Sequence, residues 1–329
     1  MTASPRIVDG FGRRFPYLRL SLTDVCNFRC SYCLPDGYKK TSRDNFLSQE
    51  EILRLVRAFV ALGVWKIRLT GGEPTIRPDF LKIVENIASM PGLRKLAFTT
   101  NGYKLPERAQ SYYDAGLRAV NISIDSLRAG QFRAITGHDR LDEVLEGVDA
   151  CFSAGFKQVK INTVLLKGLN EDELDDFIIF VRDKPVSLRF IELMRTGENQ
   201  EYFGAHHLPG TKVTERLLVH GWRSKLREEG GGPAQEFEHP RSRGTIGLIA
   251  PYSKDFCASC NRLRVSVKGD LHLCLFGEGG YSLRNLLQED NQQQELEDKI
   301  LSLLNLKKSA HFLHDNNSGT RNHLASIGG

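Results

Sequence analysis

Strand-like and helix-like segments alternate over the first two thirds of the chain. Amphipathic stretches typical of helices separate short runs that have the pattern of strands. This alternation favours parallel strands joined by right-handed crossovers. Six strands are too few for a closed eight-fold barrel, so we predict an α/β fold built on a partial barrel that is open on one side. The expected strands are Tyr17–Ser21, Val64–Thr70, Lys95–Thr100, Ala119–Ile124, Gln158–Val164 and Ser187–Leu193, and the expected helices include Ser48–Leu62, Pro78–Ser89, Leu141–Ala154 and Glu171–Arg182.

The composition changes near Glu228–Arg243, where three glycines and a proline follow one another. Glycine and proline clustered in this way are typical of a loop or linker. We therefore predict two domains, a partial barrel over residues 1–228 and a C-terminal domain over residues 229–329. The second domain contains a helical pattern near Tyr281–Leu304.

The seven cysteines cannot all form disulfide pairs, because their number is odd. Six of them fall in two tight groups, whereas Cys151 stands alone in a helical pattern and is interpreted as a small buried hydrophobic residue. The segment Met1–Arg14 lacks the apolar core of a signal peptide, and even the longest apolar runs, such as Phe177–Val181, are too short to cross a bilayer. Clustered thiols in such a chain indicate metal binding in a reducing cytoplasm, with no membrane partner.

The first cysteine group has the spacing C-x3-C-x2-C and comprises Cys26, Cys30 and Cys33, directly after the first expected strand. Three thiolates leave one iron of a four-iron cluster without a protein ligand, whereas ordinary electron-transfer clusters take four cysteines. S-adenosylmethionine (SAM) can chelate that open iron. On spacing alone, a zinc loop with a distant fourth ligand is the alternative. Tyr32, the aromatic residue before the last cysteine, favours the cluster, because the arrangement resembles that of the radical SAM superfamily.

Gly71-Gly72-Glu73 ends the second expected strand. Two glycines allow the backbone to approach a ligand closely, and a carboxylate accepts hydrogen bonds from an ammonium group. Taken alone, this sequence is a weak signal and is more often a simple tight turn. Its position resembles the superfamily's motif for the methionyl amine of SAM, and the same resemblance implies that SAM contacts Tyr32, Gly72, Glu73, Ser123 and Met194.

The second cysteine group has the spacing C-x2-C-x13-C and comprises Cys257, Cys260 and Cys274. It again offers three thiolates, and a Cys3His zinc site with His272 as the fourth ligand is the alternative. Arg262 and Arg264 follow the second cysteine of this group directly. Two guanidinium groups at that point suit a polyphosphate better than a closed structural metal site, which favours an open second cluster.

Basic residues recur at matching positions of the expected strands. Lys66 and Arg68 share one face of the second strand, because side chains alternate along a strand. Arg19 lies on the first strand and Lys160 on the fifth. Charges repeated inside a barrel that excludes water imply an anion of the size of a triphosphate. The net charge of +5 is mild and the basic residues are scattered, so no nucleic-acid partner is expected.

In their order along the chain, both cysteine groups, Gly71-Gly72-Glu73, Arg262-Leu263-Arg264 and the terminal Gly328-Gly329 resemble the GTP 3′,8-cyclase family of molybdenum-cofactor biosynthesis. The resemblance covers nearly the whole chain. It implies an incomplete (βα)6 radical SAM barrel, capped by a C-terminal domain that carries a second [4Fe–4S] cluster. It also implies a lyase that converts GTP to (8S)-3′,8-cyclo-7,8-dihydroguanosine 5′-triphosphate after a 5′-deoxyadenosyl radical takes hydrogen from C3′ of the ribose. The implied GTP contacts are Arg19, Lys66, Arg68, Thr99, Lys160, Arg262 and Arg264.

The resemblance also gives the tail a catalytic role, in which Gly328 and Gly329 enter the active site without bringing a side chain into it. Two segments depart from the family pattern: Leu324-Ala325-Ser326 before Ile327, and the loop Arg195–Asn199 after the sixth strand. The partners implied are GTP and a low-potential electron donor of the flavodoxin or ferredoxin type. The product would pass to a cyclic pyranopterin monophosphate synthase. The sequence does not decide whether the chain forms a homodimer.

Two alternative functions belong to other groups of proteins. The first is another radical SAM enzyme with an auxiliary cluster, such as a peptide-modifying maturase, although those usually carry more C-terminal cysteines than three. The second is a non-catalytic zinc-binding interaction protein, which would give Gly71-Gly72-Glu73 no role.

Overall fold

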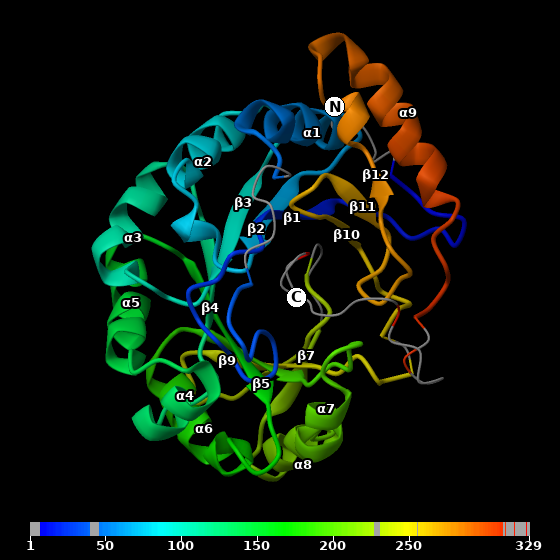
Figure 1. Ribbon diagram of the computed structural model, residues 1–329. Helices are drawn as coiled ribbons and strands as arrows, with labels where there is room; N and C mark the ends of the chain where they lie inside the picture. The colour runs from blue at the N-terminus through cyan, green and yellow to red at the C-terminus, as the bar shows by residue number, and fades with distance from the viewer. Residues whose placement is uncertain are drawn as a thin grey trace.

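The computed structural model of the chain describes residues 7–39, 46–226, 231–254 and 256–311, together with positions 313, 319 and 327. In these residues a single sheet of twelve strands curves around a central axis (Figure 1). The strands are β1 (Tyr17–Thr23), β2 (Lys66–Gly71), β3 (Lys95–Thr100), β4 (Ala119–Ser123), β5 (Gln158–Leu165), β6 (Ser187–Glu192), β7 (Arg223–Lys225), β8 (Gln235–Glu238), β9 (Thr245–Ile249), β10 (Arg262–Val265), β11 (Asp270–His272) and β12 (Tyr281–Ser282). Their order across the sheet is β12-β11-β10-β1-β2-β3-β4-β5-β6-β9-β8-β7.

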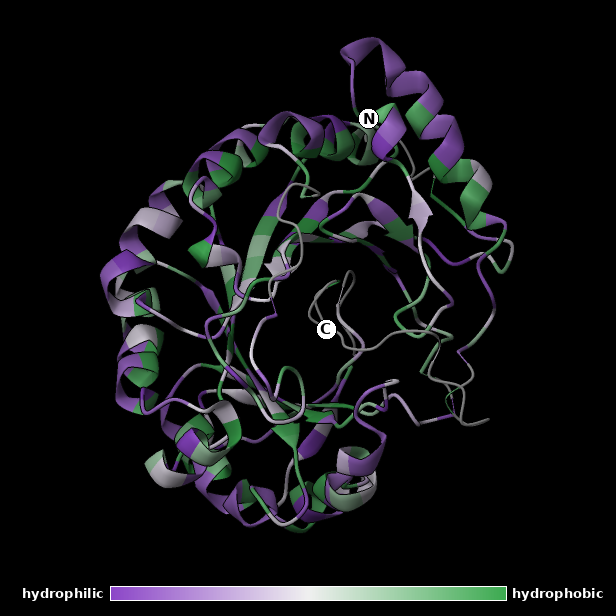
Figure 2. Cartoon of the chain, viewed as in Figure 1, coloured by the Kyte–Doolittle hydropathy of each residue, from purple (hydrophilic) through white to green (hydrophobic). Residues whose placement is uncertain are grey.

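The helices surround the sheet on its outer side (Figure 1). They are α1 (Gln49–Ala61), α2 (Phe80–Ala88), α3 (Leu105–Asp114), α4 (Ala129–Thr136), α5 (Leu141–Ser153), α6 (Leu174–Asp183), α7 (Gln200–His206), α8 (Thr211–Val219) and α9 (Gln293–Leu304). Figure 2 shows mixed hydrophobic and hydrophilic faces on these helices, as expected where one side packs on a core. α1, for example, buries Ile52, Leu55 and Phe59. None of the helices in the described residues is both long enough and apolar enough to cross a membrane.

The six predicted strands are confirmed as β1 to β6, with ends that differ by at most two residues. The alternation of buried apolar residues with inward polar ones is what made them recognisable. In β2, Ile67 and Leu69 pack outward against the helices, while Lys66 and Arg68 line the interior of the barrel.

The helical prediction near Tyr281–Leu304 is wrong over its first half. The chain first forms β12 and two short 3₁₀ turns, and α9 begins only at Gln293. The strand β12 pairs with β11, so tertiary pairing overrides the local helical pattern there. Four further helices, α3, α4, α7 and α8, are not among those named from the sequence.

The C-terminal segment completes the barrel on both sides. β9 pairs in parallel with β6, and β10 pairs in parallel with β1. Eight parallel strands therefore line the axis, two more than the six expected from the sequence. Because one sheet runs through both parts of the chain, the division after residue 228 stays a prediction.

Candidate functional site

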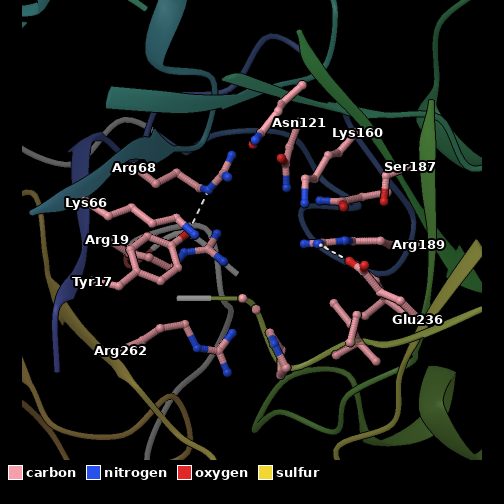
Figure 3. A pocket seen from close by; sticks show the side chains of 18 of the residues that line it. Tyr17, Arg19, Lys66, Arg68, Asn121, Lys160, Ser187, Arg189, Glu236 and Arg262 are labelled. Carbon is pink, nitrogen blue, oxygen red and sulfur yellow. Dashed lines mark hydrogen bonds and ion pairs between the residues drawn. The ribbon is translucent and has the colours of Figure 1, made fainter. Parts of the chain in front are cut away.

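A cavity of about 470 Å³ lies inside the ring of parallel strands (Figure 3). This size is within the range of small-molecule sites. Among the described residues, its wall carries eleven Lys or Arg side chains and a single carboxylate, that of Glu236. Such an excess of positive charge suits a polyanion. The basic residues are Arg19, Lys66, Arg68, Lys95, Lys157, Lys160, Arg189, Lys225, Arg243, Arg262 and Arg264.

Strand register brings three of these arginines side by side. Arg19 on β1 is paired with Arg264 on β10 and with Arg68 on β2. Neighbouring strands are about 4.8 Å apart, so three inward-pointing guanidinium groups share one level of the barrel. Because like charges repel strongly where water is scarce, this level favours an anion that neutralises them.

Burial lowers the pKa of several basic side chains of the cavity, because it disfavours their charged form. It lowers the pKa of Lys160 to about 7, with a further contribution from the charge of Arg189. Burial likewise lowers the pKa of Lys66 to about 8, partly offset by Tyr17. For Arg264, burial and the neighbouring Arg19 lower the pKa well below its usual value. An anionic ligand would stabilise the protonated form of each of these groups.

Tyr17 is a further cavity residue, and sequence reasoning missed it. Its hydroxyl accepts a hydrogen bond from Nε of Arg68 at 2.7 Å, and Nζ of Lys66 lies 4.3 Å from its ring centroid (Figure 3). Burial acts to raise the pKa of Tyr17, but the charges of Arg68, Arg19 and Lys66 outweigh it and lower the pKa to about 6. Arg68 also donates through Nη1 to the carbonyl of Phe98. Of its guanidinium nitrogens, Nη2 is therefore the one that we expect to contact a ligand.

The facing wall holds polar atoms that lack protein partners. Nη2 of Arg189 donates to Glu236 at 3.1 Å, but its buried Nε has no partner. The buried Asn121 Oδ1 and Ser187 Oγ are also unsatisfied. Figure 3 shows these side chains turned toward the same space as Lys160. Buried polar atoms without partners are costly, so a cavity lined by them indicates a polar ligand.

Arg189 could have been found from the sequence, because it alternates with the buried Leu188 and Phe190 as Arg68 does with its neighbours. Thr99, by contrast, does not line the cavity among the described residues, although it is in register with Asn121, which does. Its hydroxyl is buried and has no partner. The other six predicted GTP contacts all line the cavity wall.

The first cysteine group lies at the carboxyl end of β1, where Cys26, Cys30 and Cys33 are partly buried free thiols. Burial raises the pKa of Cys26 to about 11 and that of Cys33 to about 12. These environments do not by themselves favour thiolates, so a metal must compensate for the loss of solvent. The donor set fits such a group, because three free thiols come from one loop.

The turn Gly71-Gly72-Glu73 packs directly on that loop. The amide of Gly72 donates to the carbonyl of Thr23 at 2.9 Å, and the amide of Glu73 donates to that of Val25 at 2.8 Å. A Cβ on Gly72 would lie only 2.3 Å from the Val25 oxygen, and Gly71 has a φ of +147°. Both positions therefore require glycine, because any side chain would push the turn away from the cysteine loop.

The Glu73 carboxylate is buried and strongly held. Its Oε1 accepts from the hydroxyl of Thr75 at 2.6 Å and from that of Thr100 at 3.0 Å, while its Oε2 accepts from the amide of Asn101 at 2.6 Å. Burial raises the pKa of Glu73, and these bonds counteract part of that rise. Oε2 has the greater remaining capacity for a ligand, since Oε1 also accepts from the amide of Thr75.

Tyr32 anchors the cysteine loop to the far side of the barrel. Its hydroxyl donates to Asp125 Oδ2 at 2.9 Å, and Asp125 Oδ1 accepts from the amide of Val164 at 2.8 Å. Ser123 is the last residue of β4, two positions before Asp125, and Met194 follows β6 and lines the cavity. The predicted SAM residues thus lie at the carboxyl ends of the strands, where chemistry in barrel folds gathers.

The second cysteine group lies in the cavity wall, together with His272. Burial acts to raise the pKa of Cys260, but the charges of Lys307 and Arg262 outweigh it, so the pKa is lowered. Cys257 Sγ accepts from the amide of His311 at 3.4 Å. His272 Nδ1 lies 2.8 Å from the carbonyl of Gly279, and this contact leaves Nε2 as the nitrogen that a metal would need. The three thiols fit a cluster that faces the ligand space.

Gly328 and Gly329 lie outside the described residues, so their predicted role is untested. Ile327, directly before them, is fully buried. Its carbonyl accepts from Nη1 of Arg264 at 3.4 Å. This contact ties the last described position of the chain to an arginine of the cavity wall.

Two family models match the chain: the radical SAM superfamily over residues 20–181 and Molybdenum Cofactor Synthesis C over residues 186–313. Curated relatives named GTP 3′,8-cyclase match it almost end to end. The protein of Aeromonas hydrophila subsp. hydrophila is 58% identical, covering 98% of this chain and 95% of the relative. The protein of Stenotrophomonas maltophilia is 56% identical, covering 98% of this chain and 99% of the relative. The protein of Psychromonas ingrahamii is 54% identical, covering 100% of this chain and 97% of the relative.

Among solved structures, the chain is similar to Streptococcus suis SuiB bound to S-adenosylmethionine, with a TM-score of 0.59 and 12% sequence identity. The match covers 89% of this chain and 68% of SuiB. SuiB bound to its precursor peptide SuiA gives a TM-score of 0.57 at the same identity. At this identity the likeness shows the fold alone.

Proposed function

We propose specific residue roles on the premise that this chain belongs to the GTP 3′,8-cyclase family of the radical SAM superfamily, as its relatives and both family models show. In this proposal it converts GTP to 3′,8-cyclo-7,8-dihydroguanosine 5′-triphosphate for molybdenum-cofactor biosynthesis. The observation that carries the proposal is a cavity whose wall combines a three-cysteine group with an excess of arginine and lysine. A peptide-modifying activity would not require such a concentration of positive charge.

The first cysteine group would hold a [4Fe–4S] cluster that leaves one iron for SAM. When bound, the cluster and SAM supply the chemistry: reductive cleavage of SAM to a 5′-deoxyadenosyl radical that takes hydrogen from C3′ of the ribose. The protein holds the reactants and excludes water. Tyr32 and Gly72 position the loop and the turn around SAM, Glu73 accepts from its ammonium through Oε2, and Ser123 and Met194 complete the site at the ends of β4 and β6.

The triphosphate of GTP would bind to the level formed by Arg19, Arg68 and Arg264, with Lys66, Lys160 and Arg262 around it. Bidentate guanidinium contacts suit phosphate oxygens. Arg189, Asn121 and Ser187 extend this set on the facing wall, since their buried polar atoms lack partners. Thr99 would act from the adjacent position in register. The second cysteine group, Cys257, Cys260 and Cys274, would hold a second cluster against the guanine.

Deleting Gly328 and Gly329 is expected to stop product formation while iron content and SAM cleavage remain. The physical reason is the contact of Ile327, the residue directly before them, with Arg264 of the proposed triphosphate site. Glycine at both positions allows backbone to approach the reactants. Separate measurement of 5′-deoxyadenosine and cyclised nucleotide checks the expectation, with Gly328→Ala as the milder variant. Normal product formation without the two glycines would exclude the role.

The affinity for GTP is expected to fall by at least about tenfold per pH unit between roughly pH 7.5 and 9. In the empty cavity Lys160 has a pKa of about 7, so it is largely uncharged in this range, and binding the anion requires it to take up a proton. Isothermal titration of reconstituted enzyme with GTP at each pH gives the slope. The variant Lys160→Met should bind more weakly at pH 7 and show a shallower slope. Equal slopes would mean that Lys160 does not contact the phosphates.

The direct test of function is anaerobic incubation of reconstituted protein with dithionite, SAM and GTP, followed by mass spectrometry. We expect 5′-deoxyadenosine and a cyclised nucleotide in equal amounts. Formation of 5′-deoxyadenosine without a nucleotide product would instead favour another radical SAM activity. In the cell, a low-potential flavodoxin or ferredoxin would replace dithionite, and a cyclic pyranopterin monophosphate synthase would take the product.

A further inference from the structure

Four basic cavity residues are left without a role in the proposed binding of GTP. They are Lys95, Lys157, Lys225 and Arg243, which we call the basic rim. We propose that the basic rim is the entrance through which the nucleoside triphosphate reaches the cavity, at the amino end of the barrel strands. This proposal rests on the proposed function, and it adds a direction: GTP and SAM would approach from opposite ends of the barrel.

The cavity extends to the amino end of the barrel. The first residues of seven parallel strands line it: Tyr17, Lys66, Lys95, Gln158, Ser187, Thr245 and Arg262. Residues that precede strands line it as well, among them Trp65, Lys157, Pro185 and Arg243. Lys157, Gln158, Pro185 and Arg243 are exposed, so each of them belongs both to the cavity wall and to the outer surface. The cavity therefore reaches solvent at this end.

The carboxyl end of the barrel is crossed by the cysteine loop. The amides of Arg29 and Ser31 donate to carbonyls of α4, those of Thr136 and Ile135, at 3.0 and 2.9 Å. The Ser31 hydroxyl lies 2.8 Å from the hydroxyl of Tyr202 on α7. With the Tyr32–Asp125 bond, these contacts fasten the loop across the barrel opening. A nucleotide entering there would have to pass the SAM site, whereas entry at the basic rim leaves that site undisturbed.

The positive charge exceeds what the bound nucleotide needs. Six basic residues, those predicted from the sequence, already surround the proposed triphosphate site. The single carboxylate of the described wall, Glu236, is paired with Arg189 at 3.1 Å and so offsets little of the remainder. Arg243 donates through Nη1 to the carbonyl of Asp183, a neutral acceptor that leaves its charge in place. A positive rim on a cleft with low-dielectric walls attracts anions and raises association rates by about 10- to 10³-fold.

The basic side chains also form a graded path inward. Lys95 at the rim is in register with Lys66 on the neighbouring strand, and Lys66 is followed two residues further by Arg68. Tyr17 holds Arg68 by the 2.7 Å hydrogen bond to Nε. A phosphate chain that enters at the rim therefore meets the level of Lys95 and Lys66 before it reaches the three aligned arginines.

The test reverses charge at the two most exposed rim positions, in Lys157→Glu/Arg243→Glu. The second-order rate constant for binding of GTP itself is measured by stopped-flow tryptophan fluorescence on reconstituted, SAM-loaded enzyme without reductant. We expect a fall of about 10- to 30-fold at low salt that shrinks to about twofold at 0.5 M salt, because salt screens exposed charges. The rate of product formation at saturating GTP should stay unchanged.

The matched control is Lys82→Glu/Lys299→Glu, which makes the same charge change on exposed positions of α2 and α9. It should alter the association rate less than twofold. The proposed entrance would be overturned by an equal fall of the association rate in both double variants, or by an unchanged association rate in the rim variant. If wild-type enzyme fails to bind GTP at all, the proposed function fails instead, so the two outcomes are distinguishable.

Discussion

Cys30→Ala is expected to lower SAM cleavage and product formation by at least about 10³-fold. Cys30 lies in the loop after β1, where burial raises the pKa of its thiol well above the usual value. Its thiolate is therefore stable only when a metal stabilises it. With two of three thiolates left, the cluster should be lost. Anaerobically reconstituted protein should then hold about four irons per chain rather than about eight. Iron analysis and electron paramagnetic resonance, with and without SAM, measure the loss.

Cys151→Ala is the matched control, because Cys151 is the remaining cysteine of the chain and is buried in the core on α5. It should keep its iron and activity and lose only about 1 kcal/mol of unfolding free energy. Cys274→Ala gives the complementary result: about four irons are lost, but SAM cleavage continues. Full iron content and SAM-responsive spectra in Cys30→Ala would contradict the assignment of the first cysteine group.

Arg264→Met is expected to weaken GTP binding by about 30- to 100-fold, which corresponds to about 2–3 kcal/mol for a charge-assisted contact to phosphate. The free energy of unfolding should not fall, and an increase of about 1–2 kcal/mol is expected. Arg264 is buried next to Arg19, so its removal relieves repulsion and desolvation in the empty protein. Affinity and stability should therefore move in opposite directions. GTP titration and denaturant unfolding of the same preparation measure the two quantities.

Arg94→Met provides the comparison, since Arg94 is exposed and lies outside the cavity. Neither GTP affinity nor stability should change appreciably in that variant. A parallel loss of affinity and stability in Arg264→Met would mean that Arg264 supports the fold rather than the nucleotide. SAM cleavage without GTP should persist in both variants, which separates binding of the nucleotide from assembly of the first cluster.

The six central strands could be predicted because each carries its own signal, an apolar face that alternates with polar residues. β9 and β10 could not be predicted in this way. Each is a strand of only five or four residues, and its parallel partner lies far away in the sequence, as Leu263 does from Leu18. Only the packing of the whole sheet decides that such segments join a barrel.

The site was predictable where its residues are close in sequence. The cysteine groups and Gly71-Gly72-Glu73 are local motifs, and Arg19, Lys66 and Arg68 follow from strand alternation. Glu236 and Arg243 could not be placed, because their positions depend on how β8 pairs with β9 and how β9 pairs with β6. Tyr17 carries an ordinary strand signal, and its role follows only from the charges that the fold gathers around it.

The flanking strands β9 and β10 also determine when the reactive centre can exist during synthesis. As the barrel emerges from the ribosome, β1 and β6 each present an unpaired edge, and β10, the strand that covers β1, follows all six central strands in the chain. A chain released after the first two thirds would therefore be a partial barrel with two unpaired strand edges. Such edges are prone to aggregation and are recognised by chaperones and proteases.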